Sequence, residues 1–82
     1  MDLTVIIPVF NEVESITPLL DEIAAQFDAK DAYEIIVVDD GSVDGTPAVL
    51  QAARQTHPQL RVLRHRERYG QSMALVSGVL AA

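Results

Sequence analysis

Three short apolar runs, separated by longer segments of mixed polarity, set the pattern of this chain. They lie at residues 3–7, 33–38 and 60–63, and the first two are rich in β-branched residues. Apolar runs without regular polar alternation are typical of strands that are covered on both faces of a sheet. An amphipathic segment that predicts a helix follows each run, and a strand–helix order repeated three times predicts parallel strands in an α/β fold.

The first predicted helix has two possible starting points. Asn11 is a suitable N-cap residue, with the acidic Glu14 three positions later. Pro18 lies inside this segment, so the helix either begins near Pro18, where proline suits the first turn, or is kinked there. The second helix has clearer limits, since residues 44–47 combine a turn, a cap and a proline, and Pro58 ends the segment.

The third predicted helix, which runs from Gln71 to Ala82, has no stop signal. It lacks a glycine cap, a basic last turn and a closing proline. Three strands are also about half of a usual sheet. We therefore expect residues 1–82 to form one incomplete domain, truncated before a fourth strand. The apolar strand at residues 3–7 would then be an unpaired edge, which predicts self-association.

Composition narrows the class of protein. The chain is 49% apolar and 22% charged, which is typical of a globular protein, and it contains no cysteine. A disulfide framework and a thiolate metal site are therefore excluded. No apolar stretch reaches the roughly 18 residues of a membrane-spanning helix, so we expect this segment to be soluble.

The net charge of −6 conceals an uneven distribution. Eleven of the twelve acidic residues precede residue 45, whereas five arginines lie between residues 54 and 68. A solvated acidic face beside a basic loop is one explanation, and a basic rim that faces phosphate groups is the other. The acidic total and the lack of aromatic residues among the arginines argue against a nucleic-acid partner. His57 and His65 are expected at the surface rather than as metal ligands.

Three loops follow the carboxyl ends of the predicted strands, at residues 8–12, 39–42 and 64–71. Because ligands bind beyond these ends in an open parallel sheet, the loops are expected to line one crevice. Asp39 and Asp40 stand out, since adjacent carboxylates are costly to bury without partners. In one interpretation Asp39 caps the following turn and Asp40 is solvated. In the other, one carboxylate accepts a hydrogen bond from a nucleobase imino N–H while its neighbour orders the loop.

The first of these loops carries matching features. Pro8 and Phe10 can supply an apolar wall beside a base, and Glu12 can accept a hydrogen bond from a ribose hydroxyl. Each also has a simpler explanation, because proline commonly ends a strand and an acidic residue is favoured at the start of a helix by its dipole. The order of these features along the chain is more informative than any one of them.

Residues 5–12 (VIIPVFNE) and 37–46 (VVDDGSVDGT) resemble the opening motifs of the family-2 glycosyltransferases. Residues 69–75 (YGQSMAL) are similar to a third motif of the polyprenyl-phosphate branch, which includes the dolichol-phosphate mannosyltransferase-like and undecaprenyl-phosphate sugar transferases. The resemblance extends over essentially all 82 residues. It implies the N-terminal half of a GT-A fold, which is a three-layer, Rossmann-like arrangement with strand order 3-2-1.

The resemblance also implies which residues contact a nucleotide. Phe10 replaces the tyrosine that is more usual in the family, which keeps an aromatic face and loses a hydroxyl. Asp39 corresponds to the partner acid of the same loop as Asp40, and Arg68 to a position near the phosphates. The positions that would contact the base and the ribose are Pro8, Phe10, Glu12, Val38 and Asp40.

By the same resemblance, the whole protein would transfer a sugar from a nucleotide-diphosphate donor to a polyprenyl phosphate, with inversion, at the cytoplasmic face of a membrane. Mg²⁺ or Mn²⁺ would be held mainly by an Asp-x-Asp motif beyond Ala82, and the catalytic base would lie further on, so no catalytic residue is expected within residues 1–82. The alternative is a non-catalytic nucleotide-binding fragment or a degenerate paralogue. A dinucleotide-binding domain is disfavoured because no glycine-rich loop follows the first strand, and a receiver domain because residues 60–63 hold no aspartate.

Overall fold

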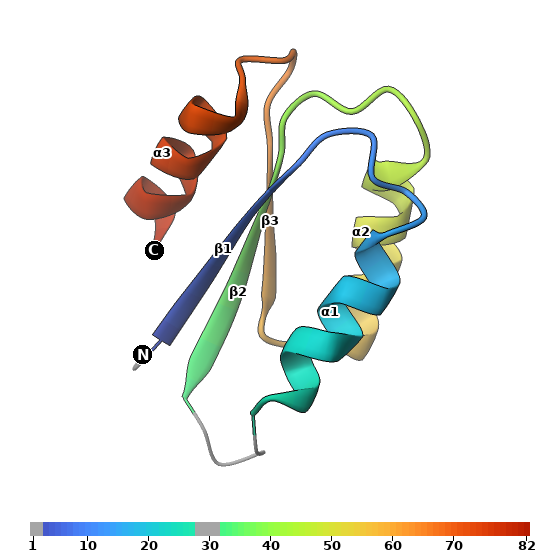
Figure 1. Ribbon diagram of the computed structural model, residues 1–82, viewed down its shortest axis with the longest axis vertical. Coiled ribbons are helices and arrows are strands. Elements are labelled where there is room, and N and C mark those ends of the chain that lie inside the picture. Colours follow the sequence, from blue (N-terminus) through green and yellow to red (C-terminus); the bar gives the residue numbers. More distant parts are fainter. Residues whose placement is uncertain (1–2, 28–31) are drawn as a thin grey trace.

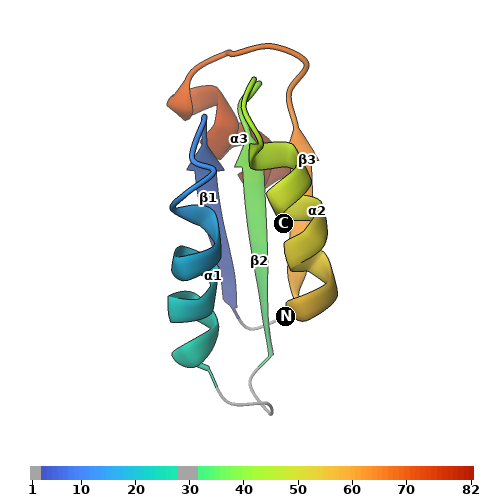
Figure 2. The same ribbon diagram turned by 90° about the vertical axis from the view of Figure 1, so that its right-hand side faces the viewer.

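Strands and helices alternate along the chain in the computed structural model, which describes residues 3–27 and 32–82 (Figure 1). The strands form one parallel sheet, with α1 and α2 on one face and α3 on the other (Figures 1 and 2). This arrangement confirms the predicted three-layer α/β fold. The elements are β1 (Leu3–Val9), α1 (Ile16–Ala25), β2 (Tyr33–Asp39), α2 (Thr46–Thr56), β3 (Leu60–Arg64) and α3 (Gln71–Ala81).

Strand β2 lies between β1 and β3, so the predicted strand order is confirmed. Every residue of β2 is buried, whereas β1 is mostly half-buried. The register places Val9 beside Asp39 and Asp39 beside Arg64, so the three strands end level with one another. The loops that leave the strands therefore all start at one edge of the sheet, where parallel α/β folds bind their ligands.

Side chains of β2 point alternately to the two faces of the sheet. Ile35 and Val37 belong to the larger core cluster, which lies beneath α1 and α2. Ile36 and Val38 pack against Ala74 of α3 on the opposite face. The uninterrupted apolar run of β2 is therefore explained by burial on both faces.

Helix α1 begins at Ile16, with Ser15 as the N-cap residue and Pro18 in the first turn. The prediction that the helix starts near Pro18 is confirmed, and the prediction of Asn11 as N-cap is wrong. Asn11 adopts a positive φ of 52° and accepts a hydrogen bond from the backbone N–H of Val43 through its side chain. Its polar group therefore serves a contact between loops rather than a helix terminus.

Helix α3 covers its face of the sheet alone, and its outer surface is apolar (Figure 1). Within the described residues, no helix is both long enough and apolar enough to cross a membrane. The exposed apolar residues of α3 are Met73, Leu75, Val76, Val79 and Leu80.

Candidate functional site

The loops after β1 and β2 are fastened to each other by hydrogen bonds. The Asn11 N–H donates to Ser42 Oγ at 2.9 Å, and the Val43 N–H donates to Asn11 Oδ1 at 2.9 Å. The Glu12 N–H donates to Thr46 Oγ1 at 3.0 Å, in the first turn of α2. Asparagine tolerates the left-handed backbone conformation that this reciprocal pairing requires. The first loop is therefore held in place by residues more than 30 positions further along the chain.

Asp39 orders the second loop. Its side chain is fully buried, and Oδ1 accepts a hydrogen bond of 2.9 Å from the backbone N–H of Ser42. Oδ2 has no hydrogen-bond partner among the described residues and lies 3.9 Å from Arg64 Nε. The prediction that Asp39 caps the turn at residues 41–42 is confirmed.

Asp40 binds the third loop, which connects β3 to α3. Only 3% of the residue is exposed, so the interpretation in which Asp40 is solvated is wrong. Oδ1 accepts a hydrogen bond from the Tyr69 N–H at 2.9 Å and lies 2.8 Å from His65 Nδ1, while Oδ2 accepts from the Gly70 N–H at 2.8 Å. Burial alone would raise the pKa of Asp40, but the hydrogen bonds from these three residues outweigh it and lower the pKa below its usual value. Asp40 is therefore an ionised acceptor at neutral pH.

Gly41 allows the second and third loops to touch. Its φ of +78° favours glycine, and a Cβ atom there would lie 2.6 Å from the carbonyl carbon of Glu67 and 2.7 Å from the backbone nitrogen of Arg68. No side chain fits in that space. The three loops therefore converge at one edge of the sheet, as the topology predicted.

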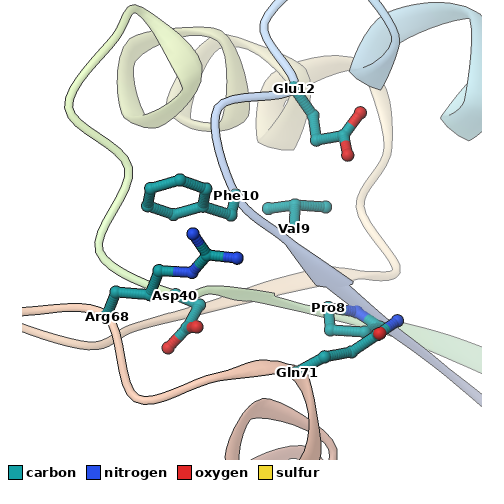
Figure 3. Close-up of a pocket in the computed structure, with 7 residues that line it drawn as sticks. All are labelled: Pro8, Val9, Phe10, Glu12, Asp40, Arg68 and Gln71. Carbon is teal, nitrogen blue, oxygen red and sulfur yellow. The ribbon is translucent and has the colours of Figure 1, made fainter.

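A pocket of about 220 Å³ opens where the loops meet (Figure 3). The Arg68 guanidinium carbon lies 4.1 Å from the centre of the Phe10 ring, which is the geometry of a cation–π contact. Val38 and Asp39 do not line the pocket, because both side chains are fully buried. The lining residues are Pro8, Val9, Phe10, Glu12, Asp40, Arg68 and Gln71.

Five of the predicted site residues therefore come together, and two further lining residues were missed. Val9 is the last residue of β1, and Gln71 is the first residue of α3 after Gly70. Their positions at element ends beside the other loops are the signal that could have indicated them. The five predicted residues that line the pocket are Pro8, Phe10, Glu12, Asp40 and Arg68.

Both histidines differ from their expected surface positions. His65 Nδ1 faces Asp40 and Nε2 lies 2.9 Å from Ser77 Oγ, with only 14% of the side chain exposed. His57 Nε2 lies 3.0 Å from Asp21 Oδ1, and 11% of its side chain is exposed. These contacts depend on tertiary packing between separate elements.

The described residues do not fit a divalent metal ion. Within residues 3–27 and 32–82, no group of three or more His, Cys, Asp or Glu side chains is placed to hold one. The Asp39 carboxylate is bound to its own loop beside Arg64, and the Asp40 carboxylate already binds the third loop. A hard cation needs several free oxygen ligands, which this part of the chain does not supply.

The fold and the pocket define a parallel α/β domain with a pocket at the carboxyl edge of its sheet. That site combines an aromatic ring, a buried ionised acceptor and a cation. The chain belongs to glycosyl transferase family 2, whose family model matches residues 4–82.

Curated relatives support the polyprenyl-phosphate branch. A dolichyl-phosphate beta-glucosyltransferase of Trichomonas vaginalis is 36% identical over 83 residues, which cover 94% of this chain and 25% of the relative. An undecaprenyl-phosphate 4-deoxy-4-formamido-L-arabinose transferase of Sodalis glossinidius is 42% identical over 78 residues, which cover 92% of this chain and 24% of the relative.

A solved structure supports the fold. A mannosyltransferase from Pyrobaculum calidifontis, in complex with GDP-Man and Mn²⁺, matches with a TM-score of 0.88 at 38% identity, over 98% of this chain and 24% of that one. The chain therefore has the fold of the GT-A glycosyltransferases and spans about a quarter of the length of the proteins it matches.

Proposed function

We propose that residues 1–82 are the nucleotide-binding portion of a sugar transferase and that the pocket of Figure 3 receives the nucleotide of the donor. The observation that carries this proposal is the ionised Asp40 carboxylate beside an aromatic ring in a pocket at the carboxyl edge of the sheet. At about 220 Å³ the pocket is smaller than the roughly 300–1,000 Å³ of typical ligand sites. It suits a base with part of its ribose rather than a whole nucleotide sugar.

Each lining residue has a chemical counterpart in a nucleotide. Asp40 accepts a hydrogen bond from a base that offers an imino N–H, because an ionised carboxylate has no hydrogen to donate. Pro8 and Phe10 pack beside the base, Glu12 accepts from the ribose hydroxyls, and Arg68 turns from Phe10 toward the phosphates. Val38 and Asp39 support these contacts indirectly, Val38 by packing the sheet against α3 and Asp39 by ordering the second loop.

Binding of nucleoside diphosphates to the natural full-length protein tests this proposal. In Asp40→Asn, the amide N–H₂ group must face a donor, because each carboxylate oxygen of Asp40 accepts a hydrogen bond from a backbone N–H. We expect the affinity for GDP or UDP, measured by calorimetry, to fall about 10- to 100-fold, the equivalent of one hydrogen bond to a charged group. Asp21→Asn removes the same charge from the exposed surface of α1 and should leave the affinity unchanged. Equal affinities of Asp40→Asn and Asp21→Asn would contradict the proposal.

For the whole protein, we infer transfer of a sugar with inversion from a nucleotide-diphosphate donor to a lipid phosphate at the cytoplasmic face of a membrane. The relatives named for dolichyl-phosphate and undecaprenyl-phosphate chemistry support this acceptor, and the neighbour solved with GDP-Man and Mn²⁺ supports the donor class and a divalent metal, Mg²⁺ or Mn²⁺. Because the described residues hold no metal cage, that metal would depend on other residues of the protein.

The 82 residues by themselves are expected to bind nucleotide without transferring sugar. The described part of the chain holds no metal cage that would stabilise a leaving diphosphate, and the family resemblance places the base that activates the acceptor outside these residues. Incubation of the 82-residue chain with labelled nucleotide sugar, metal and polyprenyl phosphate checks this expectation, and product above background would contradict it. We also expect this isolated chain to self-associate.

A further inference from the structure

A chain of hydrogen bonds runs from the pocket to the interior side of α3. His65 follows β3 directly, and its Nδ1 lies 2.8 Å from Asp40 Oδ1. Its Nε2 lies 2.9 Å from the hydroxyl oxygen of Ser77, in the middle of α3. The Tyr69 ring packs edge-on against the imidazole, with the ring centres 5.2 Å apart. The imidazole is therefore held on three sides.

The hydrogen positions in this chain follow from the charge of Asp40. Because Asp40 is ionised, Oδ1 can only accept, and His65 Nδ1 must carry the hydrogen that it donates. In a neutral imidazole Nε2 then accepts, so the Ser77 hydroxyl donates to it. The Ser77 hydroxyl, which can donate or accept, matches the tautomer that Asp40 selects and holds the far side of the ring in place.

The same contacts leave Asp40 with one free acceptor position. A carboxylate offers about four such positions, two on each oxygen. Within residues 3–27 and 32–82, Oδ1 is filled by His65 and by the Tyr69 N–H, whereas Oδ2 accepts only from the Gly70 N–H. Asp40 lines the pocket, so a hydrogen-bond donor bound there would take the remaining position on Oδ2.

We propose that His65, itself oriented by Ser77, is a positioning residue for base recognition. It fixes the rotation of the Asp40 carboxylate, so that Oδ2 presents its free position to the imino N–H of a base. This inference rests on the proposed function of the pocket as a nucleotide site. Without the hydrogen bond from His65, the Asp40 carboxylate has fewer fixed donors and can rotate. We therefore expect selectivity between bases to fall more than the overall affinity for nucleotides.

Two substitutions of His65, one that can keep its hydrogen bond to Asp40 and one that cannot, test this inference in the natural full-length protein. His65→Asn can place an amide N–H₂ near the position of Nδ1 and retain the bond to Asp40, whereas His65→Leu removes both bonds at similar volume. Affinities for GDP, UDP and ADP are measured by calorimetry. The selectivity is the affinity for GDP or UDP, whichever binds more tightly, divided by the affinity for ADP. We expect His65→Leu to lower this ratio about tenfold and His65→Asn to stay within about threefold of the wild type.

Ser77→Ala provides an independent measurement, because alanine favours helix and the variant is expected to fold. We expect Ser77→Ala to lower the selectivity about threefold. The control Ser72→Ala, at an exposed serine of the same helix, should leave it unchanged.

Unchanged selectivity in His65→Leu and Ser77→Ala, or equal loss in His65→Asn and His65→Leu, would overturn the inference while the proposed function stands. Failure of the wild type to bind any of the three nucleotides would overturn both.

Discussion

At the scale of single residues, Asp39 and Asp40 are adjacent in sequence and bind different partners. Neighbouring side chains at the end of a strand point to opposite faces of a sheet. Asp39 consequently binds its own loop at Ser42, whereas Asp40 binds the loop after β3 through Tyr69 and Gly70. The Asp39 carboxylate therefore stabilises the loop after β2, and the Asp40 carboxylate connects the loop after β3 to the pocket.

The lowered pKa of Asp40 predicts a dependence of stability on pH. In the unfolded chain the carboxyl group titrates near 3.8, and in the folded chain it titrates below that value. Its contribution to the free energy of unfolding is therefore complete above about pH 4 and is lost as the pH falls through the folded pKa. Melting temperatures of the full-length protein between pH 3 and pH 6 should fall on the acid side, and the fall should be shallower in Asp40→Asn. If the melting temperatures of the two proteins fell equally with decreasing pH, Asp40 would not be the source of this dependence.

At the scale of elements, α3 lies close to the sheet because Gly78 faces it. A Cβ atom at Gly78 would meet Ile6 Cγ2 of β1 and lie 3.4 Å from Val38 Cγ2 of β2. Ala74, one turn earlier, is also fully buried against this face. Small residues at these two positions bring α3 near the edge where Ser77 can reach His65.

Substitution of Gly78 tests this close packing. In an exposed helix, glycine to alanine is stabilising by about 1 kcal/mol. Here we expect Gly78→Ala to lower the free energy of unfolding by roughly 1–3 kcal/mol, because the added methyl group overpacks against a β-branched side chain. Urea unfolding of the full-length protein measures the change. In the double variant with Ile6→Ala the loss should be smaller than the sum of the single losses, and strict additivity would refute the contact.

The elements and the location of the site were predictable from sequence, and the contacts inside the site were only partly so. The buried run Ile35–Val38 predicted β2 because its composition suits burial on both faces, and parallel topology then predicted that the loops meet. The positions of Asn11 and His65 were not predictable, because each depends on a partner on another element. Local sequence favours a cap for an asparagine and a solvated position for a histidine among arginines, and tertiary packing overrides both.

At the scale of the whole molecule, two surfaces of the described chain are apolar and open. Strand β1 lies at the edge of the sheet, and α3 exposes several large side chains, with Leu80 at 81% exposure. Exposed strand edges and large apolar patches favour association. The chain spans about a quarter of the length of the curated relatives that it matches.

The 82-residue chain by itself is therefore expected to self-associate. Pairing of β1 edges or packing of α3 faces would bury the exposed apolar side chains. Light scattering over a range of concentrations measures the molar mass, which we expect to exceed that of the 8.9 kDa monomer and to increase with concentration. A constant monomer mass at high concentration would contradict this expectation.

We propose that the pocket at the carboxyl edge of the sheet receives a base and its ribose. The most direct measurement is a crystal structure of the natural full-length protein with GDP or UDP bound. We expect the base beside Phe10, its imino N–H within hydrogen-bond distance of Asp40 Oδ2, and the phosphates toward Arg68. A nucleotide bound elsewhere, or a base that makes no contact with Asp40, would contradict it.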